Sequence, residues 1–122
     1  MNLLDIRRRA PRIFVDGFCG VVTKHELQPA TLSNLSTLGL RLERPFDPDT
    51  ASRVVQLEIE LPGVDEIVWA SAEVTHAYLT PMKGGAKPRF WCKAGLAIAS
   101  LCGRERRLLN DYVFETLRTR RC

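Results

Sequence analysis

The sequence predicts an all-β fold, a six-stranded antiparallel β-barrel with a C-terminal α-helix packed against it. Several segments rich in β-branched and aromatic residues are separated by proline, glycine or polar turns, as in small barrels. One of them, Val55–Leu61, alternates strictly between apolar and polar side chains, which is typical of an antiparallel sheet with one face in water. Only the last segment of the chain repeats its apolar residues at helical spacing.

The size and composition indicate one ordinary globular domain. The 122 residues are 45% hydrophobic and 26% charged, which excludes a disordered chain. No apolar run approaches the roughly 18 residues of a membrane-spanning helix, so we expect no membrane insertion. The first residues place apolar side chains before the charges, the reverse of a secretory signal, and we therefore expect a cytoplasmic protein. The net charge of +4 permits an anionic partner without requiring one.

The first half of the chain contains three predicted strands. Ile13–Val22 is rich in β-branched, aromatic and small residues. A turn at Lys24–Pro29 separates it from a second strand that begins near Ala30. The third, Leu40–Glu43, alternates in polarity and is stopped by the prolines that follow it.

The second half contains three more strands and the helix. The strands are Val55–Leu61, Ile67–Tyr78 and Arg89–Ala99, with the loop Pro81–Pro88 between the last two. The helix is expected from about residue 104 to residue 118, where an apolar stripe recurs between charges: Leu108, Leu109, Tyr112, Val113 and Leu117. We therefore divide the chain into a basic N-terminal segment, residues 1–12, and a single barrel domain, residues 13–122.

No catalytic or metal-binding pattern stands out in the sequence. The four cysteines, at positions 19, 92, 102 and 122, form no Cys-x-x-Cys pair, and the two histidines do not complete a zinc pattern. His76 lies in a predicted strand, where a histidine is usually a packed or surface side chain rather than a general base. We expect no enzyme, no metal site and no cofactor.

An arginine cluster lies near the N-terminus. Arg7, Arg8 and Arg9 are consecutive, Arg12 follows Arg8 at a spacing of four, and Pro11 disfavours a helix between them. A guanidinium carries a planar fork of donors that fits a phosphate group, or the O6 and N7 atoms of guanine. The same cluster also fits a solvated tail, or nonspecific contact with nucleic acid or an acidic membrane surface.

A second polar element, Asn34-Leu35-Ser36-Thr37-Leu38-Gly39, lies between two predicted strands. Asn34 and Ser36 are two residues apart, so on an extended backbone their side chains share a face and offer hydrogen-bonding groups to a ligand. Gly39 indicates either a positive φ or a close approach of another group to the backbone.

Strand pairing can bring the two elements together. If residues 13–34 form a hairpin that turns near Thr23 and Lys24, antiparallel pairing sets Arg12 beside Asn34. The arginine loop would then lie over the polar strand end and form a pocket for guanine and phosphate. A register slip of one residue would turn the polar pair away.

The two motifs, in this order, resemble those of the PilZ domain family. Arg8-Arg9-Ala10-Pro11-Arg12 is similar to the family's Arg-x-x-x-Arg motif, and Asn34–Gly39 is similar to its Asp/Asn-x-Ser-x-x-Gly motif. Gly95-Leu96-Ala97-Ile98 resembles the family's late strand, and the closing amphipathic segment resembles its terminal helix. The resemblance spans roughly residues 7–117.

The resemblance implies a PilZ-type barrel that binds cyclic di-GMP. The residues expected at the ligand are Arg7, Arg8, Arg9, Arg12, Asn34, Ser36 and Gly39. In such a site the arginines would hold guanines and phosphates, Asn34 and Ser36 would hydrogen-bond a base, and Gly39 would shape the turn. An arginine at the position of Arg7 tends to accompany a stacked dimer of the ligand in this family. Asn34 stands where the family more often has Asp, and an amide keeps an acceptor but loses the charge.

The function that this resemblance implies is a stand-alone receptor that transmits cyclic di-GMP binding to an unidentified partner protein, as in motility regulation. One alternative is a PilZ-like adaptor that docks on motility or pilus machinery without nucleotide, and retention of both motifs counts against it. A weaker alternative is a small nucleic-acid-binding barrel that uses the basic segments Arg7–Arg12 and Arg118–Arg121. Its strands lack the aromatic platform on which single-stranded bases stack.

Overall fold

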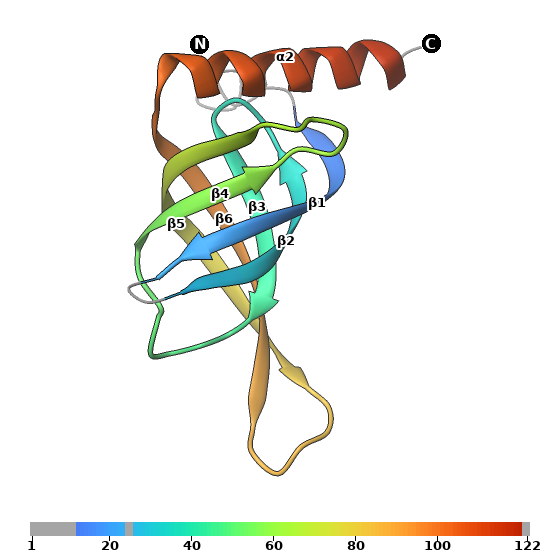
Figure 1. Cartoon of the computed structure of the whole chain (residues 1–122). Helices are drawn as coiled ribbons and strands as arrows, with labels where there is room; N and C mark the ends of the chain where they lie inside the picture. The colour runs from blue at the N-terminus through green and yellow to red at the C-terminus, as the bar shows by residue number, and fades with distance from the viewer. Residues whose placement is uncertain (1–11, 24–25, 121–122) are drawn as a thin grey trace, which may run out of the picture.

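The computed structural model describes residues 12–23 and 26–120 and has the predicted fold class. Its strands close into an antiparallel barrel in the order β1-β2-β3-β6-β5-β4 (Figure 1). The elements are β1 (Ile13–Val22), β2 (Leu27–Leu35), β3 (Gly39–Pro45), β4 (Val54–Glu60), β5 (Ile67–Met82), β6 (Arg89–Leu101) and α2 (Gly103–Arg120). The described helix is not long and apolar enough to cross a membrane.

The predicted hairpin between the first two strands is confirmed. β1 and β2 pair from Val22↔Leu27 to Ile13↔Leu35, and β1 has the predicted bounds. β2 begins earlier than expected, at Leu27, because Pro29 is tolerated inside the strand. Pro29 pairs with Gly20 on one side, and the pairing of β2 with β3 starts only at Thr31. The second edge of β2 is therefore free at Pro29, where no backbone donor is needed.

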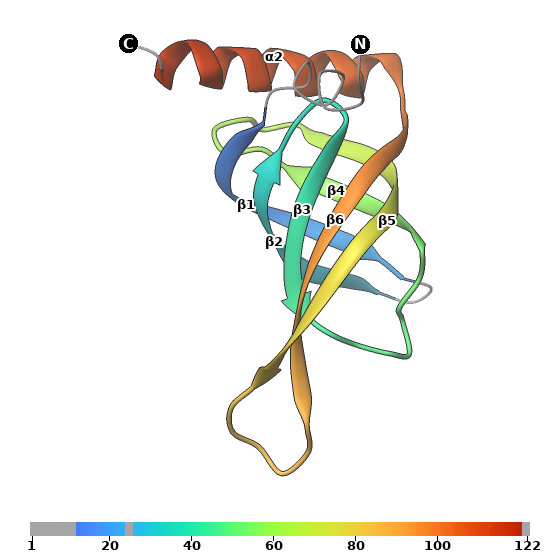
Figure 2. The ribbon, with the colours of Figure 1, turned by 180° about the vertical axis from the view of Figure 1, so that it is seen from behind.

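The last two strands are longer than predicted and form a protruding hairpin. β5 pairs with β4 only as far as Glu73, but its pairing with β6 continues to Met82↔Arg89. Residues 75–81 of β5 are exposed on both faces. Figures 1 and 2 show this hairpin extending beyond the end of the barrel that lies opposite α2.

The core fills the barrel and is closed at one end by α2. Leu32, Leu57, Ile59 and Val68 are fully buried inside the barrel. From the predicted helical stripe, Leu109 and Val113 are also fully buried, and Leu108, Tyr112 and Leu117 are partly buried against the core. The helix thus covers the end of the barrel at which the turn between β2 and β3 lies (Figure 2).

Candidate ligand-binding site

Arg12 and the polar turn after β2 lie at the same place on the barrel. Ile13 pairs with Leu35, so Arg12, one residue before Ile13, lies next to Ser36, one residue after Leu35. The predicted position of Arg12 beside Asn34 is wrong by two residues, because Asn34 pairs with Phe14. Arg12 and Ser36 also line the same surface hollow, together with Gly39. Antiparallel pairing therefore brings together side chains that are far apart in sequence.

Ser36 organises the turn between β2 and β3. Its side chain is 2% exposed, and its hydroxyl accepts hydrogen bonds from the backbone N–H of Leu38 (3.2 Å) and of Gly39 (3.0 Å). The same hydroxyl donates to the carbonyl oxygen of Gly39 at 3.2 Å. One donor and two acceptor positions are all that a hydroxyl has, so these bonds use all of them within the turn.

Gly39 is required by a close approach of two strands. Its φ is not positive, but a Cβ at this position would lie 2.6 Å from the carbonyl oxygen of Leu96 on β6. That atom belongs to the backbone and cannot move aside cheaply. Of the two explanations that the sequence left open for Gly39, the close approach is the one observed.

Asn34 is directed to the outside of the barrel, beside the hollow rather than in its lining. Its neighbour Leu35 is fully buried in the core, and successive side chains on a strand point to opposite faces. Asn34 is half-buried and pairs with Arg41 on β3 and with Phe14 on β1. Because Arg41 lines the hollow, Asn34 lies next to a residue of the site.

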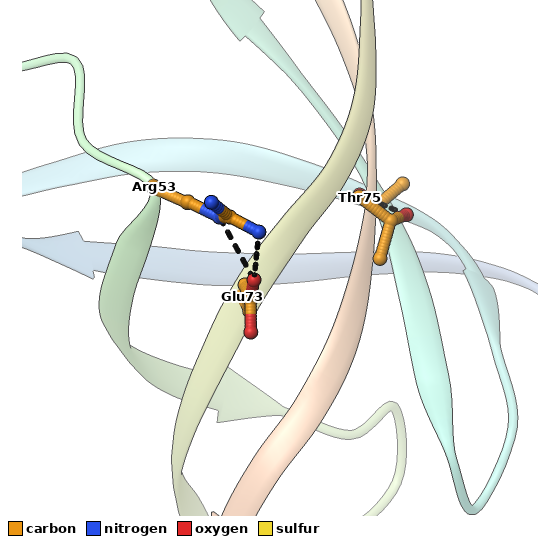
Figure 3. A network of polar contacts seen from close by, with 4 residues as sticks. Arg53, Glu73 and Thr75 are labelled. Carbon is orange, nitrogen blue, oxygen red and sulfur yellow. Dashed lines mark hydrogen bonds and ion pairs between the residues drawn. The ribbon is translucent and has the colours of Figure 1, made fainter.

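The opposite wall of the hollow is formed by β5 and β6. A β-bulge at Thr75 lies where the register shifts between Val74 and His76. The Thr75 hydroxyl donates to the carbonyl oxygen of Gly95 at 3.0 Å and lies 3.1 Å from Nδ1 of His76. Figure 3 shows Thr75 on the same strand as Glu73, whose carboxylate pairs with Arg53 at 2.8 Å.

The imidazole of His76 lies directly over Gly95. A Cβ on Gly95 would be 2.1 Å from Cε1 and 2.6 Å from Nε2 of the ring. The ring of Tyr78 meets His76 edge to face, with 5.7 Å between ring centroids. Gly95 therefore creates the space that lets a flat ring lie on the barrel surface.

The hollow itself has a volume of about 400 Å³. Its lining residues are Arg12, Ser36, Leu38, Gly39, Leu40, Arg41, Thr75, His76, Gly95, Leu96 and Ala97. The described lining carries two guanidinium groups and an imidazole, and no carboxylate. Such a site fits an anion that also has flat, hydrogen-bonding surfaces.

The structure describes four of the seven predicted site residues. Arg12, Ser36 and Gly39 line the hollow and Asn34 lies beside it. The other three, Arg7, Arg8 and Arg9, lie outside the described residues. The roles of all seven toward a ligand stay predictions.

Four residues at the site were not predicted from the sequence: Arg41, Thr75, His76 and Gly95. Arg41 could have been found, because the alternating segment Leu40–Glu43 turns it outward and the tight turn pairs it with Asn34. His76 and Gly95 carried no such signal, since they reach the site through the pairing of β3 with β6 and of β6 with β5. Those contacts join distant parts of the chain.

The family of the chain follows from comparison with known protein families. The family model of the PilZ domain matches residues 6–115. This match covers most of the chain, which therefore belongs to the PilZ domain family. No curated protein matches the sequence.

Solved structures share the fold at low sequence identity. The PilZ domain with c-di-GMP of YcgR from Escherichia coli has a TM-score of 0.66 and 15% identity, over 94% of this chain and 95% of that chain. The inhibitor of motility MotI (DgrA) from Bacillus subtilis has a TM-score of 0.71 and 17% identity, over 95% of this chain and 54% of the other. The MrkH–c-di-GMP complex from K. pneumoniae has a TM-score of 0.66 and 13% identity, over 93% and 55%. The chain thus spans about half the length of the last two proteins.

Proposed function

We propose that this chain is a receptor for cyclic di-GMP, which binds in the hollow between Arg12, the Ser36–Gly39 turn and the β5–β6 wall. Two of the similar solved structures are described as containing c-di-GMP. The observation that carries the proposal is that Arg12 and the Ser36–Gly39 turn line one hollow in a chain of the PilZ family. The ligand is bound without chemical change.

Each group of the hollow has a role that its chemistry suits. Arg12 and Arg41 donate to phosphate oxygens or to the O6 and N7 atoms of a guanine. Asn34 offers an amide oxygen to the N1–H and N2–H groups of a guanine. Ser36 holds the turn that carries this edge of the site, and a direct bond from Ser36 to a base would require one of its turn bonds to be shared.

The segment before β1 completes the proposed site. Arg7, Arg8 and Arg9 precede Arg12, and we propose that they fold over the ligand and hold a stacked dimer of it. Four or five charge-assisted contacts, less the cost of ordering this segment, leave about 8 kcal/mol, which corresponds to a micromolar Kd. Ligand bound in this way changes the surface that a partner protein meets, which makes the chain a signal transmitter.

Isothermal titration calorimetry with cyclic di-GMP tests this function. We expect micromolar binding of two ligands per chain, and no binding of GMP or cyclic di-AMP. Arg12→Ala should weaken binding by about tenfold to a hundredfold, because one charge-assisted contact contributes about 1.5–3 kcal/mol. Arg8→Ala should act in the same direction.

The matched control is Arg107→Ala, which removes an exposed guanidinium from α2, outside the hollow. It should leave the affinity unchanged. Absence of binding by the unmodified protein at tens of micromolar concentration, or equal affinities of Arg12→Ala and the unmodified protein, would refute the proposal.

A further inference from the structure

Acidic side chains are gathered on one outer surface of the barrel. Neither β1 nor residues 54–72 contain a lysine or an arginine. Their acidic residues are Asp16, Glu58, Glu60, Asp65 and Glu66. We call the surface that carries them, formed by β1, β4, the loop at residues 61–66 and the start of β5, the acidic face. Only Glu66 has a cationic partner among the described residues, Arg104 at 3.0 Å.

The acidic face also exposes large apolar side chains. Phe18 is 55% exposed and Trp69 is 51% exposed. Strand pairing sets Glu60 between Phe18 and Ile67, and sets Glu58 opposite Trp69. A hollow of about 460 Å³ lies at this face, lined by Asp16, Phe18, Glu60 and Ile67 among others. Exposed aromatic rings rimmed by charge are typical of a protein–protein contact surface.

The protruding β5–β6 hairpin has the opposite charge. Residues 74–103 contain no aspartate or glutamate. We call residues 77–92 the arm, and its exposed cations are Lys83, Lys87 and Arg89. None of the three forms an ion pair with a residue that the structure describes.

The arm also exposes large apolar side chains that a partner could cover. Tyr78 is 65% exposed, Leu79 47% and Phe90 37%. Pro81 lies in the part of β5 that has lost its β4 neighbour, and a proline or lysine at a free edge hinders the addition of another strand. The arm therefore offers a partner an apolar and cationic surface, while Pro81 makes the free edge of β5 a poor template for a further strand.

From this charge segregation we propose that two copies of this chain associate, with the arm of each copy on the acidic face of the other. The two surfaces are complementary in charge, and each leaves aromatic rings exposed that one contact would cover. Both surfaces include part of β5, because this strand begins in the acidic face at Ile67 and ends in the arm at Met82. A two-fold rotation axis crossing β5 would place the arm of each copy on the acidic face of the other. Both contacts would then form together and close the assembly as a dimer.

Sedimentation velocity of the full chain without nucleotide tests the proposal. We expect a dimer at low salt that shifts toward monomer near 1 M salt, where the Debye length falls to about 3 Å. Lys83→Glu/Lys87→Glu and Glu60→Lys/Asp65→Lys should each weaken the dimer at least tenfold. An equimolar mixture of these two variants should recover association, because every arm then meets a face of opposite charge.

The matched control is Arg106→Glu/Arg107→Glu on α2, which changes the net charge by the same amount as the arm variant and should leave the dimer intact. A monomer at every concentration in low salt would overturn the proposal, as would a dimer that persists in both surface variants. Binding of a DNA duplex by a monomeric protein, lost in the arm variant, would assign the arm to nucleic acid instead. The cyclic di-GMP titration is independent of all these outcomes, because none of the substituted residues lines the ligand hollow.

Discussion

The Thr75 hydroxyl has a single proton, and the carbonyl oxygen of Gly95, 3.0 Å away, can only accept it. The Thr75 oxygen, 3.1 Å from Nδ1 of His76, is then left to accept a hydrogen bond from Nδ1–H. In neutral His76 this leaves the free lone pair on Nε2. The bulge at Thr75 thus fixes both the position of the imidazole on the barrel surface and the atom that is free to accept from a ligand.

Gly95 acts on the site through the ring of His76, which lies over it. Gly95→Ala should weaken cyclic di-GMP binding by about tenfold, or about 1.4 kcal/mol, because its Cβ occupies the position of the His76 ring. Removal of the ring by His76→Ala should weaken binding to a similar extent. In the double variant the alanine at position 95 should add nothing, which calorimetry can measure as a coupling between the two substitutions.

The control for this cycle is Gly103→Ala, since a Cβ there would meet no atom within 4 Å. Its affinity should match that of the unmodified protein. Additive losses in the double variant would show that Gly95 acts on the site by a route other than the imidazole.

For single residues, the sequence predicted which side chains belong to the site better than it predicted what each of them bonds to. Ser36 was predicted from its spacing to Asn34, as a side chain sharing its face, but it lies in a turn after the strand has ended. Its buried hydroxyl bonds to the turn backbone. Spacing arguments assume an extended backbone, and they fail where a strand stops.

At the scale of elements, local patterns predicted most of what was observed. Both ends of β1 were predicted correctly, because β-branched residues fill the strand and turn residues flank it. The extent of β5 was underestimated, because Pro81 stops a central strand but is tolerated on the free edge beyond β4. Whether an edge is free depends on which strand lies beside it, and local sequence does not contain that information.

α2 packs one side of its surface against the end of the barrel. Leu109 is fully buried against the barrel end, whereas Phe114, off the predicted stripe, is 58% exposed. Leu109→Ala should lower the free energy of unfolding by about 2–5 kcal/mol, because it leaves a cavity in the core. Phe114→Ala should change it by less than about 1 kcal/mol. Urea denaturation followed by circular dichroism measures both values, and equal losses in the two variants would contradict the packing of α2.

At the scale of the whole molecule, barrel closure assembles the candidate site. β1 and β2 bring Arg12 to the Ser36–Gly39 turn, and a hairpin of this kind can be inferred from local sequence. The second wall depends on β3 pairing with β6, which sets Gly39 opposite Ala97 and Arg41 opposite Gly95. No local pattern contains that long-range pairing. Half of the site was therefore predictable from sequence, and the half with His76 was not.

The closed barrel also determines how stability depends on pH, through Cys19. Its side chain is fully buried in β1, and this burial raises the pKa of the Cys19 thiol to about 12. In the unfolded chain a thiol ionises near pH 8.5. The contribution of Cys19 to stability is thus fully present below about pH 8.5, and it is lost as the pH rises toward 12, because only the unfolded state then releases the proton.

We therefore predict that the free energy of unfolding falls by about 1–2 kcal/mol more between pH 8.5 and pH 10 in the unmodified protein than in Cys19→Ala, at up to about 1.4 kcal/mol per pH unit. Cys19→Ala lowers stability at every pH, but it should remove this part of the slope. Cys102→Ala, which removes an exposed thiol, should keep the slope of the unmodified protein. Urea denaturation at a series of pH values measures all three. Identical slopes for Cys19→Ala and the unmodified protein would mean that water reaches the thiol, and hence that the barrel interior opens at this strand.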